Sequence, residues 1–366
     1  MKPNLIFDAH LDLSWNAMDQ NRDLRWSLER IRRRELGMTD KSSGRNTVCL
    51  PEMRRGSVGL CVATQLARYL PYFGRNPGLG RINGRFSPEQ AWAASQGQLA
   101  WYREMETCGE MVQIRDRKQL EAHLALWQGT APGGSPKLPI GYILSLEGAD
   151  SIVSFKHLEK SYADGLRALG PAHFGPGIYA HGTDDEGPMT PRGHDLLKEM
   201  ERLGIILDVS HLCDESFWDA IGRFKGPLWA SHSNCRVLSN WNRQFNDDQI
   251  KELIRRDTVI GMVFDAKMMV HGWSEMRSQP KDFNLRIEKI CEHIDHICQL
   301  AGSARNIGIG SDLDGGFGNE QTPLDLDSIA DLVNLGDCFA ARGYPPDAID
   351  GIFYGNFVDF LRRAWR

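Results

Sequence analysis

The chain has 366 residues, of which 25% are charged and 41% hydrophobic, the balance of a soluble globular protein with ample apolar material for a core. Its formal net charge of -5 argues against nucleic acid or an anionic membrane surface as a partner, because both bind basic surfaces. No stretch is apolar over the length of a membrane span, and residues 1–4 enter a strand without a charged leader. These features predict a cytoplasmic protein.

The apolar run at residues 5–9 has strand character and ends in His10 and Asp12. Because side chains alternate along a strand, these two residues point into the same space. Imidazole nitrogen and carboxylate oxygen are ligand types that zinc accepts. The pair alone is weak evidence for a metal, since polar residues are common at strand ends. The groups that later strands bring to this place decide the question.

Strands and helices alternate along the rest of the chain. Helices are predicted at residues 87–106, 116–127, 190–204, 214–223, 247–256 and 283–300. Leaving out a short apolar piece at 111–114, eight strands are predicted near residues 5, 60, 141, 167, 205, 228, 260 and 307. Eight is the number that closes a parallel barrel, so we predict an α/β fold, a (β/α)8 TIM-type barrel that forms a single domain over residues 1–366.

Three regions fall outside this alternation. Residues 14–56 are rich in arginine and are predicted to be irregular, and residues 68–87, with repeated Gly, Pro and Arg, are predicted to form a long loop. Helices at 326–341 and 346–363 are expected to complete the chain. The long loops, together with aromatic residues such as Trp92 and Trp101 that are expected to be exposed, favour a homodimer.

Six of the eight predicted strands end in an ionisable or metal-binding side chain. In a barrel of this type the carboxyl ends of the strands meet at one face, where the chemistry lies. A catalytic zinc ion takes three protein ligands and leaves one position open. The number of candidate ligands therefore indicates a metal site with more than one ion. The residues concerned are His10 with Asp12, Glu147, His173, His211, His232 and Asp312.

Two three-ligand sites that share one carboxylate account for most of these residues. His10, Asp12 and Glu147 are predicted to bind one zinc ion, and Glu147, His211 and His232 the other. A water or hydroxide held between two ions is a competent nucleophile at neutral pH, and the ions polarise the carbonyl that it attacks. This arrangement indicates hydrolysis.

The chain resembles the membrane (renal) dipeptidase family of zinc hydrolases from Asn4 to about Arg363. The resemblance implies a barrel with two zinc ions, the five ligands named above, and Glu147 as the bridge. It also implies hydrolysis of dipeptides, including those whose second residue has the D configuration. The motifs that carry it are Asp8-Ala9-His10-Leu11-Asp12, Leu146-Glu147-Gly148-Ala149-Asp150, Leu207-Asp208-Val209-Ser210-His211, Ser231-His232-Ser233, Gly310-Ser311-Asp312-Leu313-Asp314-Gly315 and Gly355-Asn356-Phe357.

The resemblance implies roles for three further residues. Asp312 matches the carboxylate that takes the proton of the attacking water and passes it to the leaving amine, and only the family pattern favours it over Asp314. His173 matches the histidine that stabilises the oxyanion of the tetrahedral intermediate. Arg243 matches the arginine that binds the terminal carboxylate of the substrate, a task that suits the guanidinium fork.

The sequence departs from the family pattern after His173. The family has a polar, Asn-containing stretch there, whereas this chain has Phe174-Gly175-Pro176-Gly177-Ile178-Tyr179-Ala180-His181-Gly182. This difference is expected to change one wall of the substrate pocket. Two alternatives to a dipeptidase therefore stay open. One is the same barrel and metals acting on a lactone, cyclic amide or phosphoester, and the other is a catalytically silent binding protein.

Overall fold

The computed structural model describes residues 2–70, 84–129, 137–275 and 277–365 of the chain. Eight parallel strands form a barrel in which neighbours follow the order β10-β11-β1-β2-β6-β7-β8-β9. The barrel closes between β9 and β10, where Ala230 N–H donates to Val259 O (3.1 Å) and Gly261 N–H donates to Ala230 O (2.9 Å). The predicted TIM-type barrel is thus confirmed. Its strands are β1 (Ile6–Leu11), β2 (Val58–Leu66), β6 (Ile140–Glu147), β7 (Leu166–Gly170), β8 (Ile206–Asp208), β9 (Leu228–Trp229), β10 (Ile260–Met262) and β11 (Ile307–Ile309).

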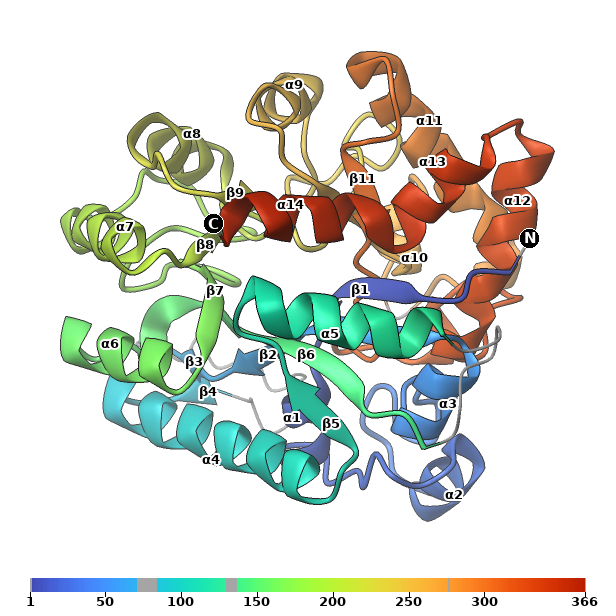
Figure 1. Ribbon diagram of the computed structural model, residues 1–366, viewed down its shortest axis with the longest axis horizontal. Helices are drawn as coiled ribbons and strands as arrows, with labels where there is room; N and C mark the ends of the chain where they lie inside the picture. The colour runs from blue at the N-terminus through green and yellow to red at the C-terminus, as the bar shows by residue number, and fades with distance from the viewer. Residues whose placement is uncertain (1, 71–83, 130–136, 276, 366) are drawn as a thin grey trace.

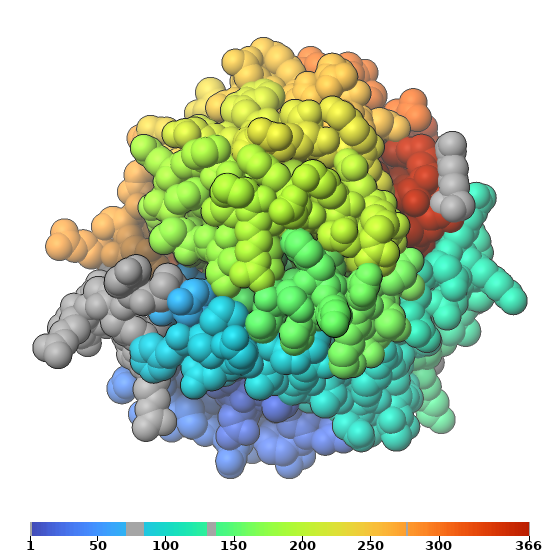
Figure 2. All heavy atoms as spheres, turned by 90° about the vertical axis from the view of Figure 1, so that its left-hand side faces the viewer, coloured from blue at the N-terminus to red at the C-terminus, as the bar shows by residue number. Residues whose placement is uncertain are grey.

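Helices surround the barrel, and on one side of it α8, α7, α6 and α4 follow one another, with α7 in contact with both α8 and α6 (Figures 1 and 2). Several begin and end at residues that the sequence marks: Ser87 and Thr190 accept hydrogen bonds from Gln90 N–H and Gly193 N–H, and left-handed Gly204 ends α7. None of the helices in the described ranges is long and apolar enough to cross a membrane. The helices that pack around the strands are α4 (Pro88–Thr107), α5 (Arg117–Gln128), α6 (Phe155–Ala163), α7 (Pro191–Leu203), α8 (Asp214–Arg223), α9 (Asp247–Arg255), α11 (Ile290–Ala301) and α14 (Asn356–Ala364).

Several segments differ from their predictions. The region expected to be irregular holds three short helices, α1 (Leu13–Met18), α2 (Leu28–Arg34) and α3 (Leu50–Arg55), because caps such as Ser27 and a proline in the first turn of α3 start helices locally. Most of the predicted 68–87 loop, residues 71–83, lies outside the described residues, but its ends pair as β3 (Arg68–Tyr69) and β4 (Gly84–Arg85). The apolar piece at 111–114 forms β5 (Met111–Gln113), which pairs with β6 outside the eight-strand circuit.

The C-terminal helices are shorter than predicted. A 3-10 turn (Ile329–Asn334) precedes α12 (Leu335–Ala341), and a π-helical turn (Gly351–Gly355) separates α13 (Pro346–Asp350) from α14. The helix expected from residue 283 begins at Ile290, after two 3-10 turns (Pro280–Phe283 and Ile287–Lys289), and α10 (Ala266–Met269) is a single turn. On α14, Phe357 packs against the barrel, its ring centroid 5.2 Å from that of Phe7 on β1 and 5.9 Å from that of Trp229 on β9.

Trp92 and Trp101 are not the exposed aromatic residues that the sequence predicted. Both are half-buried and pack against the hydrophobic core, and Trp92 meets the ring of His157 edge-on at 4.7 Å between centroids. They therefore provide no argument for a homodimer, which stays a prediction without this support.

Where the barrel closes, the backbone leaves no space for a side chain at Gly261 or Gly310. A Cβ added to Gly261 would overlap the carbonyl oxygen of Ser231 and lie 3.0 Å from the Cα of Gly310. We expect Gly261→Ala to lower the free energy of unfolding by about 2 kcal/mol or more, because backbone on two strands has to shift. Gly97→Ala, in the middle of α4 with nothing within 4 Å, should raise it by about 0.5–1 kcal/mol. Urea unfolding of both variants checks this, and equal stabilities would contradict it.

Candidate metal centre

The candidate ligands lie together at the carboxyl end of the barrel. His10 belongs to β1, Asp12 directly follows that strand, and Glu147 is the last residue of β6. The remaining four each lie three residues beyond the end of their strand, at a point where the backbone has turned over the barrel mouth. They are His173 after β7, His211 after β8, His232 after β9 and Asp312 after β11.

The carboxylate of Glu147 is the centre of this group. Its Oε1 lies 2.9 Å from His211 Nε2, 3.5 Å from His232 Nε2 and 3.6 Å from His10 Nε2. His173 Nε2 stands slightly farther away, at 3.9 Å. Four imidazole rings from four strands thus face one buried oxygen.

The donor set fits a metal site. Ligand atoms within 4.8 Å of one another occur as His10, Asp12 and Glu147, as Glu147, His211 and His232, and as His10, His232 and Asp312. The first two sets are those that the sequence analysis assigned to two ions. His10 Nε2 is buried without a hydrogen-bond partner in the structure, as expected of a nitrogen whose partner is an ion. Three imidazoles and two carboxylates match the donor preference of zinc.

Burial shifts the titration of these groups. Burial raises the pKa of Glu147 to about 8, against the opposing charge of His10. Burial alone would lower the pKa of His10, but Glu147 and Asp12 outweigh it and raise that pKa to about 10. The pKa values of His211 and His232 are lowered well below the usual range by burial, then by nearby cations such as Arg243. Neutral imidazoles keep the lone pair that a metal needs.

Hydroxyl groups orient three of the ligands, and the sequence analysis did not single them out. Ser231 Oγ lies 2.7 Å from His232 Nδ1, and Thr183 Oγ1 lies 3.0 Å from His211 Nδ1. The hydroxyl of Thr64 donates to Asp12 Oδ1. Each contact is made through Nδ1 or through one carboxylate oxygen, while the Nε2 or the second carboxylate oxygen faces the centre. Ser231 could have been found from its place beside His232, whereas Thr64 and Thr183 are distant in sequence.

The two aspartates that follow β11, Asp312 and Asp314, have different partners. Asp314 is engaged by the N-terminal region: its Oδ1 accepts hydrogen bonds from Thr47 N–H (2.7 Å) and Thr47 Oγ1 (2.8 Å), and its Oδ2 accepts one from Val48 N–H (3.0 Å). Asp312 instead places Oδ1 3.8 Å from His10 Nε2. Burial raises the pKa of Asp312 well above its usual range. Asp312 also has a left-handed backbone, with φ of 58°, a strained conformation that is common at active sites.

Arg243 and His173 border the same space. Arg243 is buried, donating from Nη1 to Ser210 O (2.7 Å) and from Nη2 to His232 O (3.0 Å), with Nη2 3.1 Å from His211 Nε2. Burial, then the charges of Arg68 and Arg243, lowers the pKa of His173 well below its usual range. A cationic guanidinium and a neutral imidazole therefore flank the carboxylates.

Three further residues complete the rim: Phe174, which belongs to the stretch that the sequence marked as a changed wall, and Arg68 and Trp241, which it did not mark. Phe174 lies edge-on to His173, with 4.8 Å between ring centroids. The ring centroid of Trp241 lies 6.4 Å from that of Phe174. Arg68 donates to Phe174 O (3.3 Å) and places its guanidinium 5.9 Å from the ring centroid. The motif after His173 predicted a changed wall there, but no sequence signal pointed to Trp241 or Arg68.

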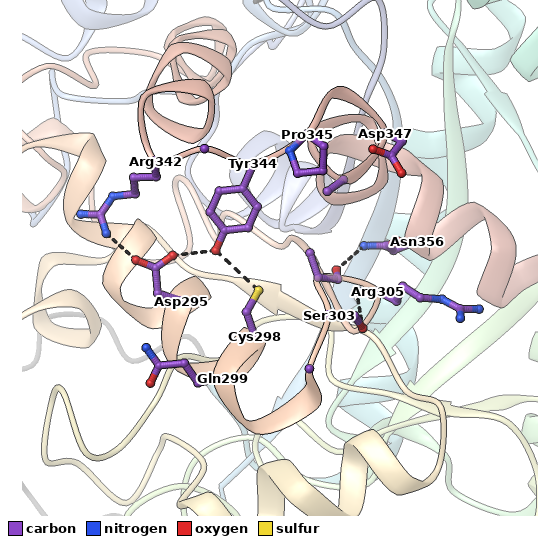
Figure 3. Close-up of a pocket in the computed structure, with 14 residues that line it drawn as sticks. Asp295, Cys298, Gln299, Ser303, Arg305, Arg342, Tyr344, Pro345, Asp347 and Asn356 are labelled. Atoms are coloured by element: carbon purple, nitrogen blue, oxygen red, sulfur yellow. Dashed lines mark hydrogen bonds and ion pairs between the residues drawn. The ribbon is translucent and has the colours of Figure 1, made fainter.

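A separate cavity of about 890 Å³ lies away from this centre, beside the amino end of β11 (Figure 3). Four of its polar groups contact one another: Asp295 accepts hydrogen bonds from Arg342 Nη1 (2.5 Å) and the Tyr344 hydroxyl (2.6 Å), and that hydroxyl also lies 3.5 Å from Cys298 Sγ. It holds none of the three ligand groups. The chemistry of the protein is therefore expected at the carboxyl end of the barrel.

Comparison with known proteins identifies the family. The sequence profile of the membrane dipeptidase family (peptidase family M19) matches residues 1–365. An uncharacterised protein of the pqqA 5′ region in Klebsiella pneumoniae is 30% identical over 220 residues, 58% of this chain and 77% of that protein. The dipeptidase tcpJ of Claviceps purpurea is 25% identical over 204 residues, 55% of this chain and 45% of that protein.

The fold comparison agrees over a longer stretch. The crystal structure of a metallopeptidase from Rhodobacter sphaeroides, liganded with a phosphinate mimic of the dipeptide L-Ala-D-Ala, superposes with a TM-score of 0.77. It covers 99% of each chain at 22% sequence identity. Because the family profile matches residues 1–365, the chain belongs to the membrane dipeptidase family, peptidase family M19, and is a metallo-dipeptidase.

Proposed function

We propose that the chain is a binuclear zinc dipeptidase that hydrolyses dipeptides with a free C-terminal carboxylate. The observation that carries the proposal is the approach of the Nε2 atoms of His10, His211 and His232 to Glu147 Oε1 within 3.6 Å. A carboxylate surrounded in this way suits a bridge between two ions. The dipeptide mimic bound by the Rhodobacter sphaeroides relative supports L,D dipeptides as substrates.

The roles of the metal ligands follow from their grouping. His10 and Asp12 would hold one zinc ion, His211 and His232 the other, and Glu147 both. Bound zinc supplies Lewis acidity, which lowers the pKa of water and polarises a carbonyl. Thr183 and Ser231 accept hydrogen bonds from Nδ1–H of His211 and His232, respectively. These bonds favour the tautomer in which the Nε2 that faces the centre carries no proton.

Three residues act on the substrate. Asp312 accepts the proton of the attacking water and donates it to the nitrogen of the leaving amino acid, and the desolvation that raises its pKa favours holding a proton between the two steps. His173, kept neutral by burial, donates a hydrogen bond to the oxygen of the scissile carbonyl as charge develops on it. Arg243 binds the terminal carboxylate and so selects substrates by length.

Removal of one ligand from either ion should be visible in the metal content. We expect His10→Ala and His211→Ala each to lower bound zinc from about two ions per chain to about one. We expect kcat/KM for dipeptides to fall roughly 100-fold or more in each variant, because each substitution removes a direct ligand of one ion. Elemental analysis of the purified proteins and a ninhydrin assay measure both. His296→Ala removes a histidine that pairs with Asp247 on the outside of the barrel, and should change neither.

The acid–base role of Asp312 separates from metal binding in a conservative variant. Asp312→Asn keeps the size and a hydrogen-bonding oxygen but removes the proton acceptor. We expect kcat to fall about 10²- to 10⁴-fold while about two zinc ions stay bound. A variant that loses zinc along with activity would show Asp312 to be a ligand instead, which its place beside His10 and His232 makes the sharpest alternative.

The proposed pairing of Arg243 with the substrate carboxylate can be tested by changing either the arginine or the carboxylate. Arg243→Ala should raise KM for a dipeptide about 100-fold, because a charge-assisted pair of hydrogen bonds is lost. Replacing the substrate carboxylate by an amide should cost the wild-type protein a similar factor and cost the variant little. If the amide substrate loses as much with the variant as with the wild-type protein, Arg243 does not bind the carboxylate.

A further inference from the structure

Two aromatic side chains beside the metal centre are not explained by the core. Phe174 and Trp241 are half-buried, and among the residues that the structure describes neither belongs to the hydrophobic core or packs against it. The ring of Phe174 instead meets the rings of His173 and His211, at centroid distances of 4.8 Å and 5.5 Å. Apolar rings that border a catalytic centre without supporting the core are available for substrate.

Polar contacts hold both rings in place. Phe174 follows His173 in a segment whose ends are paired, since Thr183 N–H donates to His173 O (2.9 Å) and Thr183 Oγ1 contacts His211. Trp241 Nε1–H donates to Asp184 Oδ1 (2.9 Å). Lys267 Nζ lies 3.7 Å from the Trp241 ring centroid. We call Phe174 and Trp241 the aromatic wall, and its position is set before any substrate binds.

The aromatic wall stands next to the proposed carboxylate site. Trp241 and Arg243 belong to one turn, closed by the hydrogen bond from Gln244 N–H to Trp241 O (3.0 Å). His211 contacts both Arg243, at 3.1 Å, and the Phe174 ring. In a dipeptide, the carbon that bears the terminal carboxylate also bears the C-terminal side chain. A carboxylate held by Arg243 therefore brings that side chain to the aromatic wall.

We propose that the aromatic wall selects dipeptides whose C-terminal residue has a large apolar side chain, aromatic ones above all; this inference rests on the proposed function. Contact with Phe174 and Trp241 removes apolar surface of such a side chain from water. Two cations stand beside the same rings, Arg68 at 5.9 Å from the Phe174 centroid and Lys267 at 3.7 Å from the Trp241 centroid. Lys267 is paired with Glu275, at 3.4 Å, but an acidic C-terminal side chain is still the competing occupant that the test has to exclude. Glycine would leave the wall without a partner.

The test compares substrates that differ only in the C-terminal residue, L-Ala-Phe, L-Ala-Gly and L-Ala-Asp, each in the available L and D forms, with the zinc-loaded protein. The wild-type protein is expected to have a kcat/KM for Ala-Phe about tenfold or more above those for Ala-Gly and Ala-Asp. A higher kcat/KM for Ala-Asp than for Ala-Phe would show that Arg68 and Lys267 decide the selection, and would overturn the inference. Trp241→Ala and Phe174→Ala should each lower the ratio of kcat/KM for Ala-Phe to that for Ala-Gly roughly tenfold. Because the ratio is measured on one sample, a partly inactive preparation does not affect it.

Two variants make the outcome specific to the aromatic wall. Trp241→Phe keeps an aromatic ring and should retain most of the ratio. Trp218→Ala removes a tryptophan of α8 that is 42% exposed and should leave both the ratio and the activity unchanged. Equal losses for Ala-Phe and Ala-Gly in Trp241→Ala and Phe174→Ala, or a wild-type protein that cleaves all three dipeptides alike, would overturn the inference and leave the proposed function standing. A zinc-loaded protein that cleaves none of them would overturn both.

Discussion

The structure of the catalytic end depends on one buried carboxylate. Glu147 Oε1 is withdrawn from water and faces three imidazole nitrogens within 3.6 Å. A buried carboxylate without compensation is costly, so the surrounding groups have to supply positive charge or metal. The strands that bring His10, His211 and His232 to this oxygen are therefore constrained in register and tilt, since a shift of one residue would turn each ligand away from the centre.

Two further buried aspartates lock the strand ends that carry these ligands. Asp8, two residues before His10, accepts hydrogen bonds from Ser311 N–H, two residues beyond the neighbouring strand β11 (2.8 Å), and from His10 N–H (3.2 Å). Asp208 repeats the arrangement between β8 and β9, where its Oδ1 accepts from Ser210 N–H and Ser231 N–H, both at 3.1 Å. Each carboxylate accepts a hydrogen bond from a backbone N–H just beyond the end of the neighbouring strand, β11 for Asp8 and β9 for Asp208, in place of a backbone carbonyl. The ligand that follows is thereby fixed to two strands at once.

The sequence could predict the parts that follow from strand geometry. Alternation places His10 and Asp12 on one side of a strand, and parallel strands bring Glu147, His211 and His232 to the same end of a barrel, so their grouping needed no knowledge of the loops. Spacing could not separate Asp312 from Asp314, because both follow β11 with a left-handed backbone and differ only in their distant partners.

The parts that escaped prediction depend on how loops fold back. Thr183 reaches His211 because its segment pairs with His173, and Trp241 joins Phe174 from a loop 67 positions later in the chain. The predicted bounds of the C-terminal helices were wrong for a related reason. The helical periodicity of residues 346–363 continues through the π-helical turn at Gly351–Gly355, where packing against β11 and β1 overrides local propensity.

This division between strands and loops has a chemical consequence. The proposed metal ligands sit on strands or within three residues of them, held by carboxylates and hydroxyls that leave little freedom. Phe174 and Trp241 sit on loops tied to that frame through Thr183 and through the turn of Arg243. Substitutions in these loops can change which side chain meets the aromatic wall without moving Glu147 or its histidines. The segment after His173 is such a place, because it carries Phe174 while His173 and His211 stay beside Glu147, their Nε2 atoms 3.9 Å and 2.9 Å from its Oε1.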